Sequence, residues 1–283
     1  MSSTTQSVPA PELAAQQGAT LPRLVRIMQQ LLAPGGCPWD REQSFASLRR
    51  YVLEEACEVI DAIDGGNPEE LREELGDLLL QIVFQAELAR AQGWFGPDDV
   101  VATICDKLER RHPHVFGSLV LDDADQVRRN WVRIKQREKQ GRSLLAGIPR
   151  SLPALTRAQR VGEQARTVGF DWKDASGPRD KVREELDELD VAVASGATER
   201  VQSELGDVLF ALVNLARHLG VDPERALRST TDRFAARFAH VERRVQEQHG
   251  GFDGGPGDGA QRVPVETLDS YWEEAKDIEK ETP

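Results

Sequence analysis

One pattern of four carboxylates occurs twice in this chain, and it limits the possible fold more than any other feature. Each copy has two Glu residues three apart, followed by a Glu-Leu-Gly-Asp tetrapeptide. The acidic residues are Glu55, Glu58, Glu74 and Asp77 in the first copy and Glu185, Glu188, Glu204 and Asp207 in the second. Within each copy the two pairs lie 19 residues apart, and the copies are offset by 130 residues. The duplication predicts two domains of one kind.

The acidic pairs suggest a metal site. Residues three apart share one face of a helix, so each copy should present two facing pairs of carboxylates. At about 4 Å two like charges repel by roughly 4 kcal/mol even at an effective dielectric of 20, and a bound cation removes that repulsion. Oxygen ligands at this density suit Mg²⁺ or Mn²⁺. The pattern therefore favours a metal-dependent enzyme acting on a phosphate ester or anhydride over a solvated acidic face.

The glycine of each Glu-Leu-Gly-Asp segment, Gly76 or Gly206, supports this interpretation. Gly inside a helix costs about 1 kcal/mol relative to Ala. We expect a close helix approach or a metal to account for that cost.

Composition excludes some classes of binding partner and of cellular location. The net charge of -12 argues against a nucleic-acid polymer, because phosphate backbones attract Lys and Arg. No apolar run reaches the length of a membrane span, and the first twenty residues do not resemble a secretory signal. The three cysteines form no C-x-x-C pair, which is typical of a reducing cytoplasm.

Apolar periodicity and capping residues predict an all-α chain with the same plan in both halves. The expected helices are 21–32, 44–63, 67–92, 98–111 and 123–139, then 152–168, 179–195, 198–219, 223–248 and 265–280. The expected segments are a flexible tail at 1–19, an N-terminal domain at 20–140, a linker at 141–153 and a C-terminal domain at 154–283.

The repeat continues into a set of cations and aromatics. Asp-Lys/Arg-x-x-x-Arg-x-x-His-Val occurs at 106–115 and at 232–241, and Trp-x-x-x-Lys occurs at 131–135 and 272–276. Such cations are usually partners of nearby acids. Because they recur beside the acidic pattern in both halves, we interpret them as phosphate ligands.

Several stretches of the chain resemble the MazG family of nucleoside triphosphate pyrophosphohydrolases, in its tandem two-domain bacterial form. They are GCPWDREQSF (36–45), DKLERRHPHVFG (106–117), GIPRSLPALTRAQ (147–159), VGFDW (168–172) and VNLARHLG (213–220). The resemblance covers roughly residues 20–283. It implies two MazG-type helical domains whose four-helix-bundle cores are completed by homodimerisation. The implied reaction is Mg²⁺-dependent cleavage of nucleoside triphosphates at the α–β anhydride, giving the monophosphate and pyrophosphate.

The resemblance also implies roles for particular residues, with the C-terminal copy as the catalytic one. The implied metal ligands are Glu185, Glu188, Glu204 and Asp207, and the implied nucleotide contacts are Lys181, Arg233, Arg237, Trp272 and Lys276, with Asn214 as a weaker candidate. Glu55, Glu58, Glu74 and Asp77 form a second candidate metal site. The copies differ at one place, since Tyr51 precedes Glu55 where Lys181 precedes Glu185.

Two alternatives remain open at this stage. A helical interaction protein could use the acidic faces to dock a basic partner without chemistry. An enzyme of the same kind could also act on another nucleoside polyphosphate or on a modified nucleotide, because the sequence contains no readable code for the base.

Overall fold

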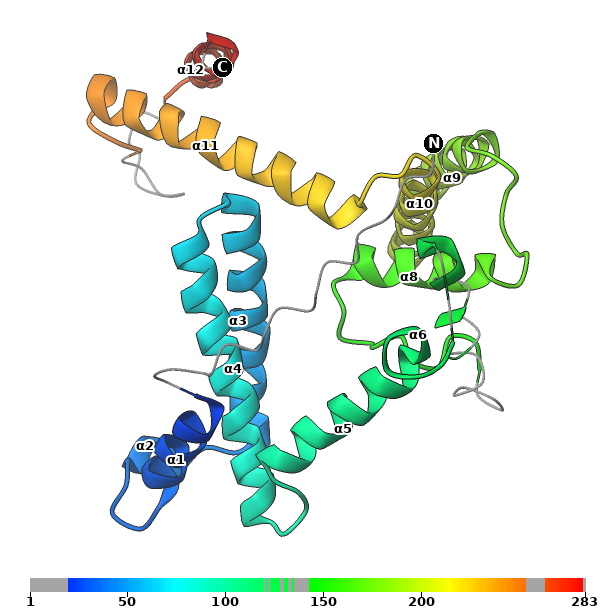
Figure 1. Ribbon diagram of the computed structural model, residues 1–283. Coiled ribbons are helices and arrows are strands. Elements are labelled where there is room, and N and C mark those ends of the chain that lie inside the picture. Colours follow the sequence, from blue (N-terminus) through cyan, green and yellow to red (C-terminus); the bar gives the residue numbers. More distant parts are fainter. Residues whose placement is uncertain are drawn as a thin grey trace, which may run out of the picture. The chain divides into compact units, whose positions relative to one another are not determined.

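Every regular element in the described residues is a helix (Figure 1). The computed structural model describes residues 20–119, 121, 123–127, 130, 131, 134, 143–252 and 263–281. Over these residues it contains no strand, which confirms the all-α prediction. Within the same residues, no helix combines the length and the apolar character that a membrane span requires. The chain divides into two units, Met1–Glu138 and Lys139–Pro283.

The first unit is built around an antiparallel pair of long helices. Its helices are α1 (Leu21–Leu32), α2 (Pro38–Arg41), α3 (Phe45–Gly65), α4 (Pro68–Ala91), α5 (Pro97–Arg111) and α6 (Pro113–Phe116). Ser44 caps α3 through a reciprocal bond with Ser47, and Gly66 ends it in the left-handed region at φ 70°. Asn67 then caps α4, so the chain reverses within two residues.

A small apolar core fixes α1 against this pair. Met28 of α1, Leu48 of α3, and Val83 and Phe84 of α4 are each at most 3% exposed and pack together. This core involves the C-terminal half of α4, which contains Val83 and Phe84. The acidic residues of α4, Glu74 and Asp77, lie in its N-terminal half and outside the core.

The second unit repeats the pair with different surroundings. Its helices are α8 (Ala154–Arg166), α9 (Ser176–Ser195), α10 (Thr198–His218), α11 (Pro223–His249) and α12 (Val265–Glu281). Gly196, at φ 70°, ends α9 as Gly66 ends α3. Helix α8 packs across α10, and α12 packs on α11, whose N-terminus is capped by Asp222.

The predicted helices agree closely with the observed ones, with ends that differ by a few residues. The expected tail at 1–19 lies outside the described residues, as does much of the helix expected at 123–139. The short helices α2 and α6 were missed, because four residues are too few to show a helical period. Of the expected linker, residues 143–153 are described, and they contain turns.

Candidate metal centre and nucleotide site

Three carboxylates of the second unit meet between α9 and α10. Glu185 and Glu188 lie one turn apart on α9, and Glu204 lies on the facing side of α10. One oxygen from each lies within 4.8 Å of the others. Glu185 is buried, at 6% exposure, while Glu188 is exposed. The fourth predicted ligand, Asp207, is not among the carboxylates that converge at this distance.

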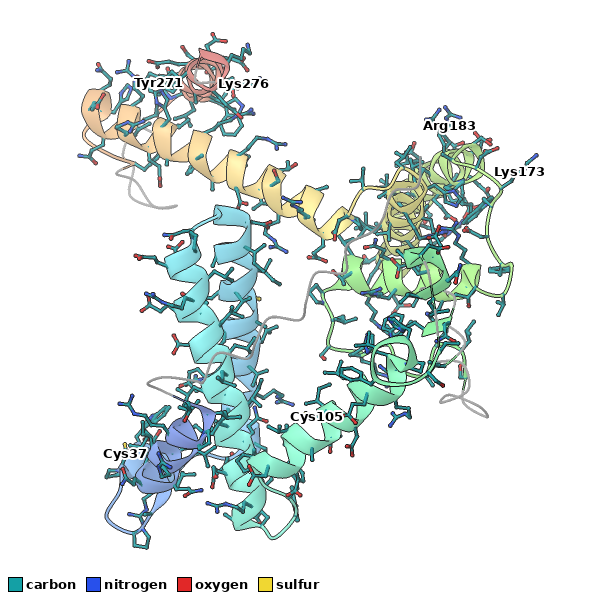
Figure 2. All side chains as sticks on the ribbon, in the orientation of Figure 1. Cys37, Cys105, Lys173, Arg183, Tyr271 and Lys276 are labelled. Carbon is teal, nitrogen blue, oxygen red and sulfur yellow. The ribbon has the colours of Figure 1, made fainter. Side chains whose placement is uncertain are left out.

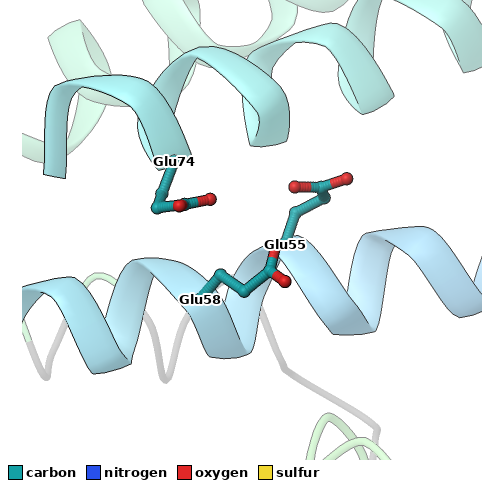
Figure 3. Close-up of side chains that lie close together, drawn as sticks. All are labelled: Glu55, Glu58 and Glu74. Carbon is teal, nitrogen blue, oxygen red and sulfur yellow. The ribbon is translucent and has the colours of Figure 1, made fainter. Parts of the chain in front are cut away.

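The first unit contains the same arrangement between α3 and α4. Figure 3 shows Glu55 and Glu58 on one helix and Glu74 on the facing helix. Their oxygens also come within 4.8 Å of one another, and Asp77 again lies outside the group. Burial, followed by the charges of Asp77 and Glu58, raises the pKa of Glu55. The pKa of Glu74 is raised by desolvation and then by Glu58 and Asp77.

The two groups differ in their counter-charges. Lys181 Nζ lies 2.5 Å from Glu185 Oε1 and 2.9 Å from Glu184 Oε1, and these hydrogen bonds raise the pKa of the lysine. Arg200 Nε lies 3.6 Å from Glu204 Oε1.

The equivalent positions in the first unit are Tyr51 and Glu70, neither of which supplies a cation. Instead Gln81 Nε2 donates to Glu55 Oε1 at 3.4 Å, and the buried Gln81 Oε1 has no hydrogen-bond partner in the part of the chain that the structure describes. The second unit thus pairs two of its triad carboxylates with cations, whereas the described residues of the first unit show no such ion pair at Glu55, Glu58 or Glu74.

The donor set of both groups fits a small divalent cation. Mg²⁺ holds oxygen ligands at about 2.1 Å, so ligands on opposite sides of it lie roughly 4.2 Å apart. Carboxylate oxygens already within 4.8 Å of one another reach such separations with small side-chain rotations. Both triads therefore fit Mg²⁺ or Mn²⁺.

The predicted nucleotide contacts gather elsewhere in the second unit, between α11 and α12. Trp272 packs on Phe234 with ring centroids 4.9 Å apart, and the guanidinium of Arg237 lies 5.7 Å from the Trp272 ring. Arg237 also pairs with Glu279 at 2.6 and 2.8 Å. Arg233 donates to the hydroxyls of Ser229 and Thr230 at 3.1 and 3.0 Å, and Lys276 donates to Glu273 at 2.7 Å.

A groove of about 290 Å³ opens beside this cluster. It is lined by Arg233, Ala236, Arg237, His240, Arg243, Ala275, Ile278 and Glu279. Side chains cover both helices here, with Lys276 and Tyr271 labelled on α12 (Figure 2). The cationic lining suits an anionic ligand.

The carboxylates and these cations come from different pairs of helices. Glu204 lies near the start of α10, about 21 Å along the helix from His218 at its end, and α11 begins only after that end. Helix α12, with Trp272 and Lys276, packs against α11. Within the described residues of one chain, the structure thus forms both halves of the predicted site but does not join them.

Asn214 has a packing environment that the sequence did not indicate. It is 5% exposed, donates to the Phe210 carbonyl, and accepts a hydrogen bond from Arg217 at 3.2 Å. A Cβ at Gly162 of α8 would lie 2.8 Å from its Oδ1, so α8 crosses closely at this point.

Sequence reasoning also missed the ion pair between Arg217 and Asp171. Arg217 donates to both Asp171 oxygens, at 2.7 and 2.5 Å, and His218 Nε2 donates to the same carboxylate at 3.0 Å. These bonds hold the pKa of Asp171 well below its usual range. The family-like stretches VGFDW and VNLARHLG contain all three residues, and they were the signal available.

The expected close approach at the two Glu-Leu-Gly-Asp glycines is wrong for the single chain. A Cβ at Gly76 or Gly206 would meet no atom within 4 Å among the described residues. Packing among the described residues therefore does not explain these glycines.

Two family models match the chain, one in each unit. The model described as the MazG nucleotide pyrophosphohydrolase domain matches residues 43–116. The model described as phosphoribosyl-ATP pyrophosphohydrolase matches residues 158–234. The matched segments contain the acidic residues of the first and second units, respectively.

Two similar relatives align over nearly the whole chain. A protein of Thermotoga maritima, named nucleoside triphosphate pyrophosphohydrolase/pyrophosphatase MazG, is 43% identical over 92% of this chain and 97% of its own length. A nucleoside triphosphate pyrophosphohydrolase of Escherichia coli strain K12 is 44% identical over 90% of this chain and 96% of its own length. The similarity thus extends over both units and both carboxylate groups.

Proposed function

The chain belongs to the MazG family of nucleoside triphosphate pyrophosphohydrolases, and we propose that it cleaves nucleoside triphosphates at the α–β anhydride with Mg²⁺. The products are the nucleoside monophosphate and pyrophosphate, and the role is nucleotide-pool housekeeping. Mn²⁺ is expected to replace Mg²⁺. The observation that carries the proposal is the convergence of Glu185, Glu188 and Glu204 to within 4.8 Å between two helices.

The carboxylates of the second unit hold the metal in this proposal, with Asp207 joining them one turn after Glu204. A divalent cation held there supplies Lewis acidity toward the triphosphate and toward an attacking water. As an alternative to activation of this water by the metal alone, a carboxylate of the group such as Glu185 takes its proton. Lys181 contacts the phosphates from the same helix.

The cations of α11 and α12 bind the rest of the nucleotide. Arg233, Arg237 and Lys276 offer charged donors to the phosphates, where negative charge develops as pyrophosphate leaves. Trp272 supplies a flat apolar surface beside the nucleotide. Asn214, fixed under α8, is the weakest member of the proposed set.

A homodimer is part of the proposal. Leu205, Leu209 and Leu212 follow helical spacing along α10 and are 44–47% exposed. Their counterparts on α4, which are Leu75, Leu79 and Ile82, are 40–49% exposed. Two-helix units with apolar faces this open suit pairing with a second copy into four-helix bundles. Pairing also offers a route to join carboxylates and cations that one chain keeps apart.

The second unit is the catalytic copy in this proposal, and the first is a second candidate metal site with a structural or regulatory role. The ammonium of Lys181 is present only in the second unit, where the first has Tyr51. The enzyme is proposed to work in the cytoplasm, in keeping with the free thiols of Cys37, Cys57 and Cys105.

Product analysis tests the proposal. The common NTPs and dNTPs are incubated with the protein in Mg²⁺ or in EDTA, and the products are separated by ion-exchange chromatography. We expect monophosphate and pyrophosphate only with Mg²⁺. Diphosphate plus inorganic phosphate would refute the proposed bond cleavage, and turnover in EDTA would refute the metal.

Three variants locate the activity. Glu204→Ala should abolish hydrolysis, whereas Glu74→Ala should retain it. Glu199→Ala, which removes an exposed acid from the first turn of the same helix as Glu204, controls for a general loss of negative charge. Equal losses in Glu204→Ala and Glu74→Ala would instead make both copies necessary.

A further inference from the structure

The ammonium of Lys181 contacts the carboxylate of Glu185, one of the three carboxylates that would hold a metal. Lys181 lies one turn before Glu185 on α9, and its Nζ lies 2.5 Å from Glu185 Oε1. Glu185 is the buried member of the carboxylate triad, with a side-chain exposure of 8%. Most of this side chain is therefore removed from water, and the lysine lies close enough to neutralise its carboxylate directly.

A divalent cation and this ammonium cannot both sit close to that oxygen without strong repulsion. A metal at about 2.1 Å from Glu185 Oε1 would lie within about 4.6 Å of the Lys181 Nζ observed here. A doubly charged ion and an ammonium at that separation repel strongly, even at an effective dielectric of about 20. Repulsion of this size favours movement of Lys181 away from Glu185 when a metal binds there.

The first unit serves as an internal comparison. Tyr51 takes the place of Lys181, and Glu70 takes the place of Arg200. The amide of Gln81, which is neutral, contacts Glu55 instead. The two units share the triad of carboxylates, yet among the described residues only the second places a cation on it.

We propose that Lys181 is a built-in competitor for the metal at Glu185, so that a divalent cation entering the second unit displaces the lysine and frees its ammonium for the substrate. This proposal rests on one part of the proposed function, namely that the carboxylates of the second unit bind a divalent metal. Displacement couples metal binding to the release of the lysine, because the cation reaches full coordination only when Lys181 has moved away from Glu185. A triphosphate that arrives with the metal gives the released ammonium a new anionic partner, which favours loading the metal together with the nucleotide.

Direct Mn²⁺ binding without nucleotide tests this competition in the full-length chain. Free Mn²⁺ is measured by electron paramagnetic resonance during a titration, in a Glu74→Gln background that removes one carboxylate from the triad of the first unit. Adding Glu204→Gln to this background identifies the binding that belongs to the second unit. Circular dichroism of each variant confirms that the helices are intact.

Three further variants separate the competitor from a general charge effect. Lys181→Met should tighten Mn²⁺ binding on the order of tenfold, equivalent to about 1.4 kcal/mol. Lys181→Arg should bind as the background does, because it keeps a cation beside Glu185. Lys173→Met removes an exposed lysine from the loop before α9 and should also leave the affinity unchanged.

The outcomes that would overturn the proposal are equally definite. An affinity that stays the same or weakens in Lys181→Met means that the lysine does not compete for the site. Equal tightening in Lys173→Met means that only net charge matters. Since Mn²⁺ binding is read without nucleotide, it can succeed or fail independently of the hydrolysis assay that tests the proposed function.

Discussion

Arg217 donates two hydrogen bonds to Asp171, at 2.7 and 2.5 Å, and so ties the loop before α9 to the last turns of α10. The two side chains are 7% and 12% exposed. His218 donates a third bond to the same carboxylate. Because Glu204 lies on the helix that this pair anchors, the network fixes α10 at the end opposite the carboxylate triad.

Removing this carboxylate should destabilise the second unit. Asp171→Ala leaves Arg217 buried without a counter-ion, which typically costs about 3–5 kcal/mol. Urea unfolding followed by circular dichroism measures the change. Asp174→Ala removes an exposed carboxylate of the same loop, which accepts two hydrogen bonds from Ser176, and it should cost less than Asp171→Ala. An equal loss in both variants would show that the burial of the Asp171–Arg217 pair adds nothing.

The same residue makes stability depend on pH. The pKa of Asp171 is lowered in the folded protein by Arg217 first, so its contribution is complete above the unfolded value of about 3.9. It is lost as the pH falls below that value toward the lower folded pKa. The melting temperature of the wild type should therefore drop more between pH 5 and pH 3 than that of Asp171→Asn. Melting temperatures that fall equally in the wild type and in Asp171→Asn would contradict the assignment of this pH dependence to Asp171.

Neutralising one acid of the first triad should stabilise the chain in EDTA. Desolvation and neighbouring carboxylates raise the pKa of Glu55, so its charge is unfavourable in the fold. Glu55→Gln should raise the free energy of unfolding by about 0.5 kcal/mol, because solvent screens the repulsion between these partly exposed carboxylates. Calorimetry in EDTA checks this, with Glu54→Gln, the next residue outside the triad, as the control. A lower stability of Glu55→Gln would mean that the carboxylates do not repel one another.

The crossing of α8 over α10 should not tolerate a methyl group. A Cβ at Gly162 would approach Asn214 Oδ1 to 2.8 Å and Arg217 Nε to 3.0 Å. Gly162→Ala should therefore destabilise by about 1–3 kcal/mol. Gly206→Ala, which meets open space in a helix interior, should instead stabilise the fold by about 0.5–1 kcal/mol. Chemical denaturation of both variants decides whether the crossing is as close as the structure has it.

The exposed face of α10 should be required for dimerisation. Leu209→Glu places a charge at the centre of the Leu205, Leu209 and Leu212 face, and multi-angle light scattering should detect monomer in place of dimer. The control is Val265→Glu, which adds the same charge at another exposed apolar position, at the start of α12, and should remain dimeric. A Leu209→Glu variant that remains fully dimeric would remove this face from the interface.

Local sequence patterns predicted the helices and the pairing of acids well. Capping by Ser44 and Asn67, the left-handed turns at Gly66 and Gly196, and i, i+3 spacing are encoded by neighbours along the chain. They place three carboxylates together in each unit. The same patterns could not show that Asp77 and Asp207 lie outside the converging group, because that depends on how the two helices pack against each other.

Local sequence patterns could not predict contacts between residues that are far apart in the chain. Asp171 and Arg217 are separated by 46 positions, and a loop residue has no periodicity to reveal its partner. The same holds for Arg237, whose partner Glu279 lies on another helix. Lys181 was implied as a nucleotide contact by the family resemblance, but only the structure shows that it is paired with Glu185.

The tight turn at Gly196 sets a limit on how the length of this chain can vary. Each residue added within α9 after Glu188, or within α10 before Glu204, would rotate one carboxylate by about 100° around its helix axis relative to the others. A single insertion or deletion there would break up the triad even if both helices stayed intact. We therefore expect functional homologues to keep the 19-residue interval free of length changes, while their side chains between the acids diverge.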